Sequence, residues 1–206
     1  MLVTEVRKIT DRRKKILLED GTSFVLYNSE VRQFGIHENE ELPDEMIRRI
    51  MEEILKKRAC LRCMNLLKTQ DRTVQQLRQR LLNDGYPDEI ITRALEYVAS
   101  YHYTDDMRFA RNYFRQMSGR KSRRQIEFEL LKKGVDRETV RAALCEAEEE
   151  SGSGTNKEKE AILAIARKRN YDPETAGSKE AARLLRYLLN KGFAYESIRE
   201  AIHFSD

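Results

Sequence analysis

A pair of apolar helix patterns joined by a glycine occurs three times along the chain. The three glycines are Gly85, Gly134 and Gly192, which lie 49 and then 58 residues apart. Seven further positions keep the same offset from the glycine in every copy. In chain order they are Leu77, Leu81, Leu82, Glu89, Ile91, Ala94 and Leu95; then Ile126, Leu130, Leu131, Glu138, Val140, Ala143 and Leu144; then Leu184, Leu188, Leu189, Glu196, Ile198, Ala201 and Ile202.

The matched positions predict a tandem array of helical repeats. Unrelated amphipathic helices would share the apolar positions, but they would not share the glycine, the glutamate and the alanine. Apolar residues four apart lie on one face of a helix. A glycine directly after cations such as Lys132 and Lys133 is typical of a helix end. One helix pair buries its apolar face poorly, whereas stacked copies bury it well.

We divide the 206 residues into four segments. Residues 1–56 are expected to form a β-hairpin or small sheet followed by a linking helix. Three helical repeats of three helices each are expected over 57–103, 104–150 and 151–206. The predicted fold class is therefore mainly α with a small N-terminal β extension. A Ser-Gly-Ser-Gly joint at 151–154 and an insertion at 170–178 account for the longer second glycine spacing.

The first segment has the alternation and the turn residues of paired strands. A β-friendly alternating run ends at Ile9, and apolar runs at 15–18 and 23–27 flank Asp20-Gly21. Asp-Gly between apolar runs predicts a hairpin with a type I′ turn. From Pro43 onward, an apolar stripe predicts a helix that continues almost without a break into the first repeat.

The sequence indicates no catalytic centre and no metal site. It has no glycine-rich phosphate loop and none of the common catalytic motifs. Cys60 and Cys63 form a CxxC without the two further ligands that zinc requires, so we interpret them as ordinary helix residues. Asp105 and Asp106 are interpreted as residues that cap and begin a helix, because adjacent helix residues do not face one site.

The N-terminus, the apolar runs and the cysteines predict the cellular compartment. No signal-peptide pattern and no apolar run of membrane-spanning length is present, and the three cysteines are an odd number. We therefore expect a cytoplasmic protein with reduced thiols and no membrane contact. The sequence has no exposed heptad seam of the kind that would indicate a dimer, so we expect a monomer.

Positive charge is concentrated in the second repeat. The net charge of the chain is only +4, but residues 108–141 hold 11 cations and four anions, whereas residues 1–56 hold 10 cations and 12 anions. The acidic run Glu146–Glu150 follows and partly hides this basic stretch in the total. The cations that we predict to contact a partner or DNA are Arg108, Arg111, Arg115, Arg120, Lys121, Arg123, Arg124, Arg137 and Arg141.

Two interpretations of this basic stretch remain open. Arginine binds phosphate and carboxylate with paired hydrogen bonds, so the partner is either DNA or an acidic protein surface. Binding to DNA would be salt-sensitive and largely independent of sequence. The alternative is that the cations simply form a solvated helix face.

Motifs in the second repeat resemble those of the RecX regulatory protein family. The family's Tyr-x-Asp-Asp-x-x-Phe-Ala pattern is matched by Tyr103, Asp105, Asp106, Phe109 and Ala110. The helix motif that follows it is matched by residues 122–134. The resemblance extends over nearly the whole chain, including a β-containing extension that some members have. The third repeat departs most, through the 170–178 insertion.

The resemblance implies a cytoplasmic modulator of the RecA recombinase that needs no cofactor. Members of the family are elongated, curved helical modules that lie in the groove of the RecA–DNA filament, contact neighbouring RecA protomers, and restrain filament growth, ATP hydrolysis and strand exchange. Some also bind single- or double-stranded DNA directly. Two alternatives are a helical-repeat DNA-binding protein that acts independently of RecA, and a helical adaptor for another partner.

Overall fold

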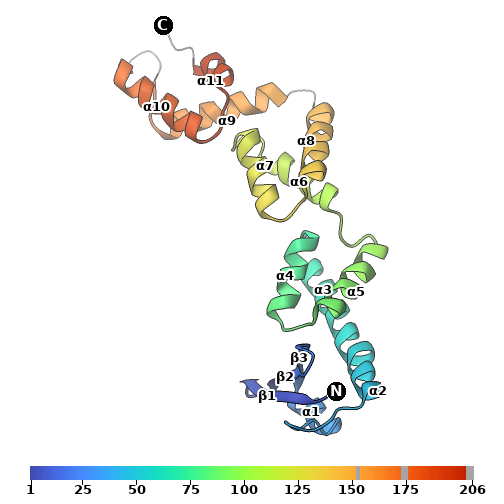
Figure 1. Cartoon of the computed structure of the whole chain (residues 1–206). Helices are drawn as coiled ribbons and strands as arrows, with labels where there is room; N and C mark the ends of the chain where they lie inside the picture. The colour runs from blue at the N-terminus through green and yellow to red at the C-terminus, as the bar shows by residue number, and fades with distance from the viewer. Residues whose placement is uncertain (152–153, 173–175, 203–206) are drawn as a thin grey trace. The chain divides into compact units, whose positions relative to one another are not determined.

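The computed structural model describes residues 1–151, 154–172 and 176–202, which divide into two compact units. The first unit is Met1–Asp105 and the second is Asp106–Asp206. The fold is mainly α, with a small three-stranded antiparallel sheet at the N-terminus, as the sequence predicts (Figure 1).

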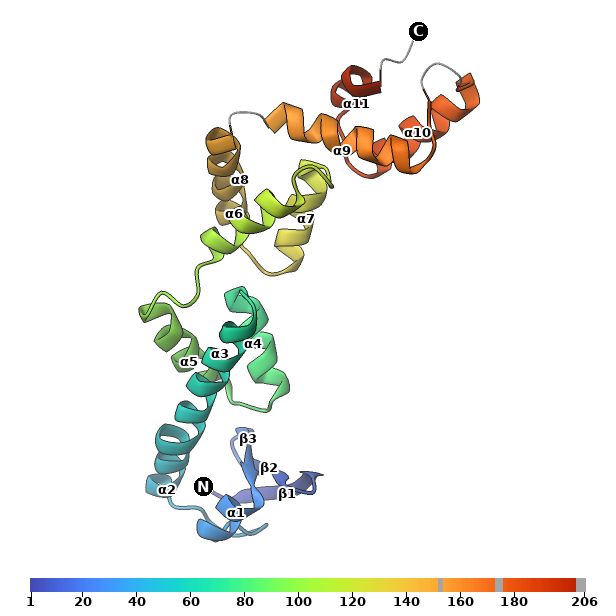
Figure 2. The same cartoon turned by 180° about the vertical axis from the view of Figure 1, so that it is seen from behind.

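The first unit holds the sheet, the linking helix and the first repeat. Its elements are β1 (Val3–Thr10), β2 (Arg13–Leu18), β3 (Ser23–Tyr27), α1 (Asn28–Gln33), α2 (Asp44–Arg49), the π-helical segment η1 (Ile50–Lys56), α3 (Lys57–Thr69), α4 (Val74–Asn83) and α5 (Asp88–Ser100). Figures 1 and 2 both show a continuous rod from α2 into α3, so the predicted unbroken linking helix is confirmed.

The sheet has the order β1-β2-β3, so β2 is its central strand. Lys8 lies opposite Lys14 on β2, and Ile16 of β2 lies opposite Phe24 of β3. The predicted type I′ turn is wrong, because among the described residues of this loop only Gly21 has a positive φ, of 85°. Instead the Asp20 carboxylate accepts a hydrogen bond of 2.9 Å from the Thr22 N–H, which stabilises a four-residue connection.

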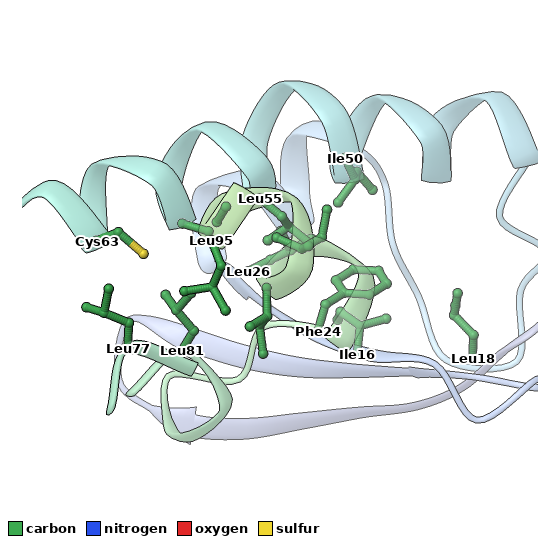
Figure 3. Close-up of a cluster of buried hydrophobic side chains, with 14 of the residues drawn as sticks. Ile16, Leu18, Phe24, Leu26, Ile50, Leu55, Cys63, Leu77, Leu81 and Leu95 are labelled. Atoms are coloured by element: carbon green, nitrogen blue, oxygen red, sulfur yellow. The ribbon is translucent and has the colours of Figure 1, made fainter. Parts of the chain in front are cut away.

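One face of the sheet packs against the helices of the first unit. Figure 3 shows Ile16, Phe24 and Leu26 pointing toward Ile50 and Leu55. The same cluster includes Leu77, Leu81 and Leu95 of the first repeat. A sheet of three short strands has too little apolar surface of its own, so its stability depends on these helices.

The second unit holds the other two repeats. Its helices are α6 (Asp106–Met117), α7 (Arg123–Lys132), α8 (Arg137–Ser151), α9 (Gly154–Lys168), α10 (Ser178–Asn190) and α11 (Tyr195–Ile202). Each repeat has its own apolar core, one around Ile126 and Leu130 and the other around Leu184 and Leu188. Part of the predicted joint, 152–153, and part of the insertion, 173–175, lie outside the described residues.

The three repeat glycines adopt the same backbone conformation. Gly85, Gly134 and Gly192 have φ angles of 86°, 86° and 83°. The N–H after each glycine donates to the carbonyl five residues earlier, at 3.1 to 3.2 Å: Tyr86 to Leu81, Val135 to Leu130, and Phe193 to Leu188. This is a Schellman helix end, which needs a left-handed residue and therefore favours glycine.

The sequence pattern suggests that the third apolar position of each copy is buried in the core. In the structure, Leu82, Leu131 and Leu189 lie at its edge. Leu82 and Leu189 are 39% and 43% exposed, and Leu131 is only partly buried. The reason is geometric: this residue follows its buried neighbour directly, so it points about 100° away from the buried stripe.

Candidate functional site

The matched motif at the start of the second repeat contributes to the core and to the helix start. Ala110 is fully buried in the core of the middle repeat. Phe109 is partly buried, and its ring stacks on Tyr113 at a centroid distance of 6.2 Å. Asp106 is the first residue of α6, where the positive end of the helix dipole stabilises a carboxylate. Tyr103 is 49% exposed, and its ring stacks on Tyr101.

Four of the nine predicted contact cations form ion pairs within the repeat. Arg111 contacts Glu146 at 3.1 Å, and Arg115 pairs with Glu150. Arg123 pairs with Glu148, and Lys121 contacts Glu129 at 2.6 Å. The acidic run after the basic stretch is therefore part of α8 and neutralises a large share of the basic stretch.

Four of the other five cations are exposed at two separate places. Arg120 and Arg124 flank the start of α7, and Arg137 and Arg141 lie in the first two turns of α8. None of these four has an ion pair in the described part of the chain. Because Arg123 pairs with Glu148, the first group lies near the carboxyl end of α8, and about 16 Å of helix separates it from Arg137. Arg108 is also exposed, on α6.

Glu129 organises a polar cluster that the sequence did not reveal. Its carboxylate accepts hydrogen bonds from the Tyr113 hydroxyl, from Lys121 and from Gln125, the last at 3.2 Å. The ammonium groups of Lys121 and Lys133 lie 5.9 and 5.2 Å from the centre of the Tyr113 ring. Only the helical spacing of Gln125 and Glu129 was visible in the sequence, since Tyr113 belongs to another helix.

The pKa shifts in this cluster follow from these contacts. Hydrogen bonding to Glu129 raises the pKa of Lys121. Partial burial would raise the pKa of Glu129, but hydrogen bonds from Lys121 and Tyr113 outweigh it and lower that pKa. Partial burial and the bond to Glu129 raise the pKa of Tyr113. The cluster therefore holds Lys121 in its charged form and beside a carboxylate.

The lowered pKa of Glu129 predicts an acid-sensitive contribution to stability. The unfolded chain binds a proton on this residue more readily than the folded chain does, so the contribution is complete above the unfolded pKa of about 4.3 and is lost as the pH falls through the folded value. We expect Glu129→Gln to lower the free energy of unfolding by about 1 kcal/mol at pH 7 and by less at pH 3. Urea unfolding at both pH values measures this difference.

Glu127 provides the matched control for that experiment. It lies on the same helix and has no ion pair in the described part of the chain. Glu127→Gln should leave stability nearly unchanged at both pH values. An equal loss for the two variants would contradict the role assigned to Glu129.

A buried serine connects the middle repeat with the third repeat. The Ser122 hydroxyl oxygen accepts a bond of 3.1 Å from the Gln125 N–H, which caps α7. The same hydroxyl donates a bond of 2.6 Å to the Lys191 carbonyl, directly before Gly192. A Cβ on Gly192 would lie 3.1 Å from that hydroxyl oxygen and 3.2 Å from Cβ of Arg124. Arg124 therefore uses its aliphatic stem in this junction as well as exposing its charge.

The described residues contain no group of three or more potential metal ligands. Cys63 is fully buried, and burial raises the pKa of its thiol to about 11, so this thiol is a poor nucleophile and a poor ligand at neutral pH. No helix in the described ranges is both long and apolar enough to span a membrane.

Family comparisons identify all three repeats. The RecX first, second and third three-helix domain models match residues 59–97, 105–144 and 157–202. The chain belongs to the RecX family. Relatives named "Regulatory protein RecX" include one from Caldanaerobacter subterraneus subsp. tengcongensis, 29% identical over the full length of both chains. Another, from Clostridium botulinum (strain Alaska E43 / Type E3), is 26% identical and covers 96% of this chain and 92% of its own.

Solved RecX structures share the fold. A crystal structure of regulatory protein RecX matches with a TM-score of 0.62 and 22% identity, covering 98% of each chain. A crystal structure of RecX from Lactobacillus salivarius matches with a TM-score of 0.59 and 20% identity, covering 72% of this chain and 95% of its own.

Proposed function

We propose that this protein binds the RecA–DNA filament in the cytoplasm and restrains its ATPase and recombinase activities without a cofactor. The observation that supports this most strongly is the match of all three repeats to the RecX regulatory family.

We assign fewer cations to the partner surface than the nine predicted from the sequence. Lys121 and Arg123 are compensated by Glu129 and Glu148, so they have less charge to offer an acidic protein or DNA phosphate. We assign the contact to the exposed cations without an ion pair in the described structure, Arg120, Arg124, Arg137 and Arg141.

The test is RecA ATPase activity on single-stranded DNA, with this protein titrated well below one copy per RecA. We expect inhibition at substoichiometric amounts, because a modulator of filament growth acts on many subunits at once. No change in ATPase activity, with DNA binding retained in fluorescence anisotropy, would support the alternative of a helical-repeat DNA-binding protein that acts independently of RecA.

The surface itself is tested by replacing its four cations with glutamine. Arg120→Gln, Arg124→Gln, Arg137→Gln and Arg141→Gln together should weaken filament binding at least tenfold and flatten its salt dependence. Glutamine keeps the stem carbons of Arg124 that contact Gly192. A control variant with the same charge change replaces four exposed cations of the third repeat with glutamine: Arg167, Lys179, Arg183 and Arg186. Equal weakening in both variants would contradict the assignment.

A further inference from the structure

The most concentrated run of cations in the chain lies in the N-terminal sheet. Residues 7–15 contain six cations and one anion, and Arg12, Arg13, Lys14 and Lys15 are consecutive. The segment net charge of 1–56 conceals this run. Arg13, Lys14 and Lys15 lie on β2, and Arg7 and Lys8 lie on β1. Lys8 contacts Asp11 at 2.6 Å, and Arg7 lies 3.8 Å from Glu5.

The arrangement of these cations opposes the stability of the sheet. Lys8 lies directly opposite Lys14, and Arg7 lies directly opposite Lys15. Like charges in such cross-strand pairs repel each other and destabilise a sheet. Proteins often place lysine on edge strands to prevent aggregation, but β2 is the central strand and needs no such protection. A charge pattern that weakens the fold indicates a role in binding.

The cations Arg13 and Lys15 also line a groove between the sheet and the glycine turn of the first repeat. The groove has a volume of about 650 Å³, and its other wall is residues 82–89. The anions on that wall are already paired: Asp84 with Arg62 at 2.8 Å, Asp88 with Arg78 at 3.2 Å, and Glu89 with Arg93 at 2.7 Å. The uncompensated charge of the groove is therefore positive.

A second groove adjoins the first and adds aromatic surface. Its volume is about 400 Å³, and it shares five lining residues with the first groove: Arg13, Val25, Asp84, Gly85 and Tyr86. Tyr27 and Tyr86 line it, and Tyr27 is 42% exposed. Arg58 also lines it, but it is paired with Glu30, and its guanidinium lies 4.6 Å from the centre of the Tyr27 ring, so the uncompensated cation of this groove is Arg13. Cations that follow a phosphate backbone next to aromatic rings that stack on bases are typical of single-strand binding.

We propose that the groove face of β2 and the two adjoining grooves bind single-stranded DNA, with Arg13 and Lys15 contacting phosphates and Tyr27 contacting a base. This site is separate from the middle-repeat surface and uses DNA alone as its ligand. Its failure is therefore distinguishable from a failure of the proposed action on RecA, which is read from ATPase activity.

The test measures binding of the full-length protein to a fluorescent oligo(dT) by anisotropy between 50 and 200 mM salt. We expect Arg13→Gln and Lys15→Gln together to weaken binding about tenfold at 100 mM salt. The slope of log K against log salt should fall in magnitude by about 1.4, as expected for two lost phosphate contacts on a single strand. The melting temperature should stay equal or rise, because the repulsive cross-strand pair of Arg7 and Lys15 is removed.

The control is a third-repeat variant with the same two-unit charge change, Arg183→Gln and Arg186→Gln, which should bind oligo(dT) like the unchanged protein. Equal weakening in the control would overturn the proposal, since net charge alone would then explain it. No binding by the unchanged protein at 50 mM salt would also overturn it. Tighter binding to duplex DNA of the same length would overturn the single-strand assignment.

Discussion

Gly85→Ala is expected to destabilise the first unit by roughly 3 kcal/mol. Two costs add up at this position. Gly85 has a φ of 86°, and a side chain in the left-handed region costs about 1–2 kcal/mol. A Cβ at Gly85 would lie 2.3 Å from Cγ2 of Val25, and overpacking of this kind costs about 1–3 kcal/mol. Urea unfolding of the full-length protein, with hydrogen exchange in residues 1–105 to localise the effect, measures the loss.

A matched glycine and a double variant separate these two costs. Gly21 has a φ of 85°, and a Cβ there meets nothing within 4 Å, so Gly21→Ala should show the backbone cost alone. Val25→Ala removes the carbon that a new Cβ would strike, so Gly85→Ala should cost about 1–2 kcal/mol in that background. The assignment fails if Gly85→Ala costs the same with and without Val25.

The glycine shows what sequence periodicity reveals and what it does not. Three glycines at fixed offsets predicted helix ends, and each has the expected left-handed backbone. The close approach of Gly85 to Val25 was not visible, because it joins residues 60 positions apart in the chain. Local backbone requirements leave a trace in a sequence pattern, whereas contacts between distant segments do not.

The candidate basic surface was also only partly predictable from the sequence. A count of charges located the cation-rich second repeat, and the exposed positions of Arg120, Arg137 and Arg141 agree with it. Helices α6 and α8 run parallel and side by side, so Arg111 meets Glu146 and Arg115 meets Glu150. This pairing was not visible in the sequence. The net charge of residues 1–56 also concealed the cations of β2, because acidic residues elsewhere in this segment outnumber them.

Ser122→Ala is expected to cost roughly 2 kcal/mol, although it removes only one oxygen. The hydroxyl caps α7 through the Gln125 N–H, and loss of an N-cap costs about 1 kcal/mol. The same hydroxyl, which is fully buried, donates to the Lys191 carbonyl, and loss of that hydrogen bond costs about a further 1 kcal/mol. Urea unfolding measures the total.

The second hydrogen bond gives this variant an effect that a simple cap would not have. Because the Lys191 carbonyl belongs to the turn between α10 and α11, Ser122→Ala should also accelerate amide hydrogen exchange across residues 184–202. Asp136→Ala is the control: Asp136 accepts a bond of 2.9 Å from the Thr139 N–H at the start of α8 and is exposed. It should cost about 1 kcal/mol and leave exchange in the third repeat unchanged. If both variants changed that exchange equally, Ser122 would be a helix cap and not the connection between the two repeats.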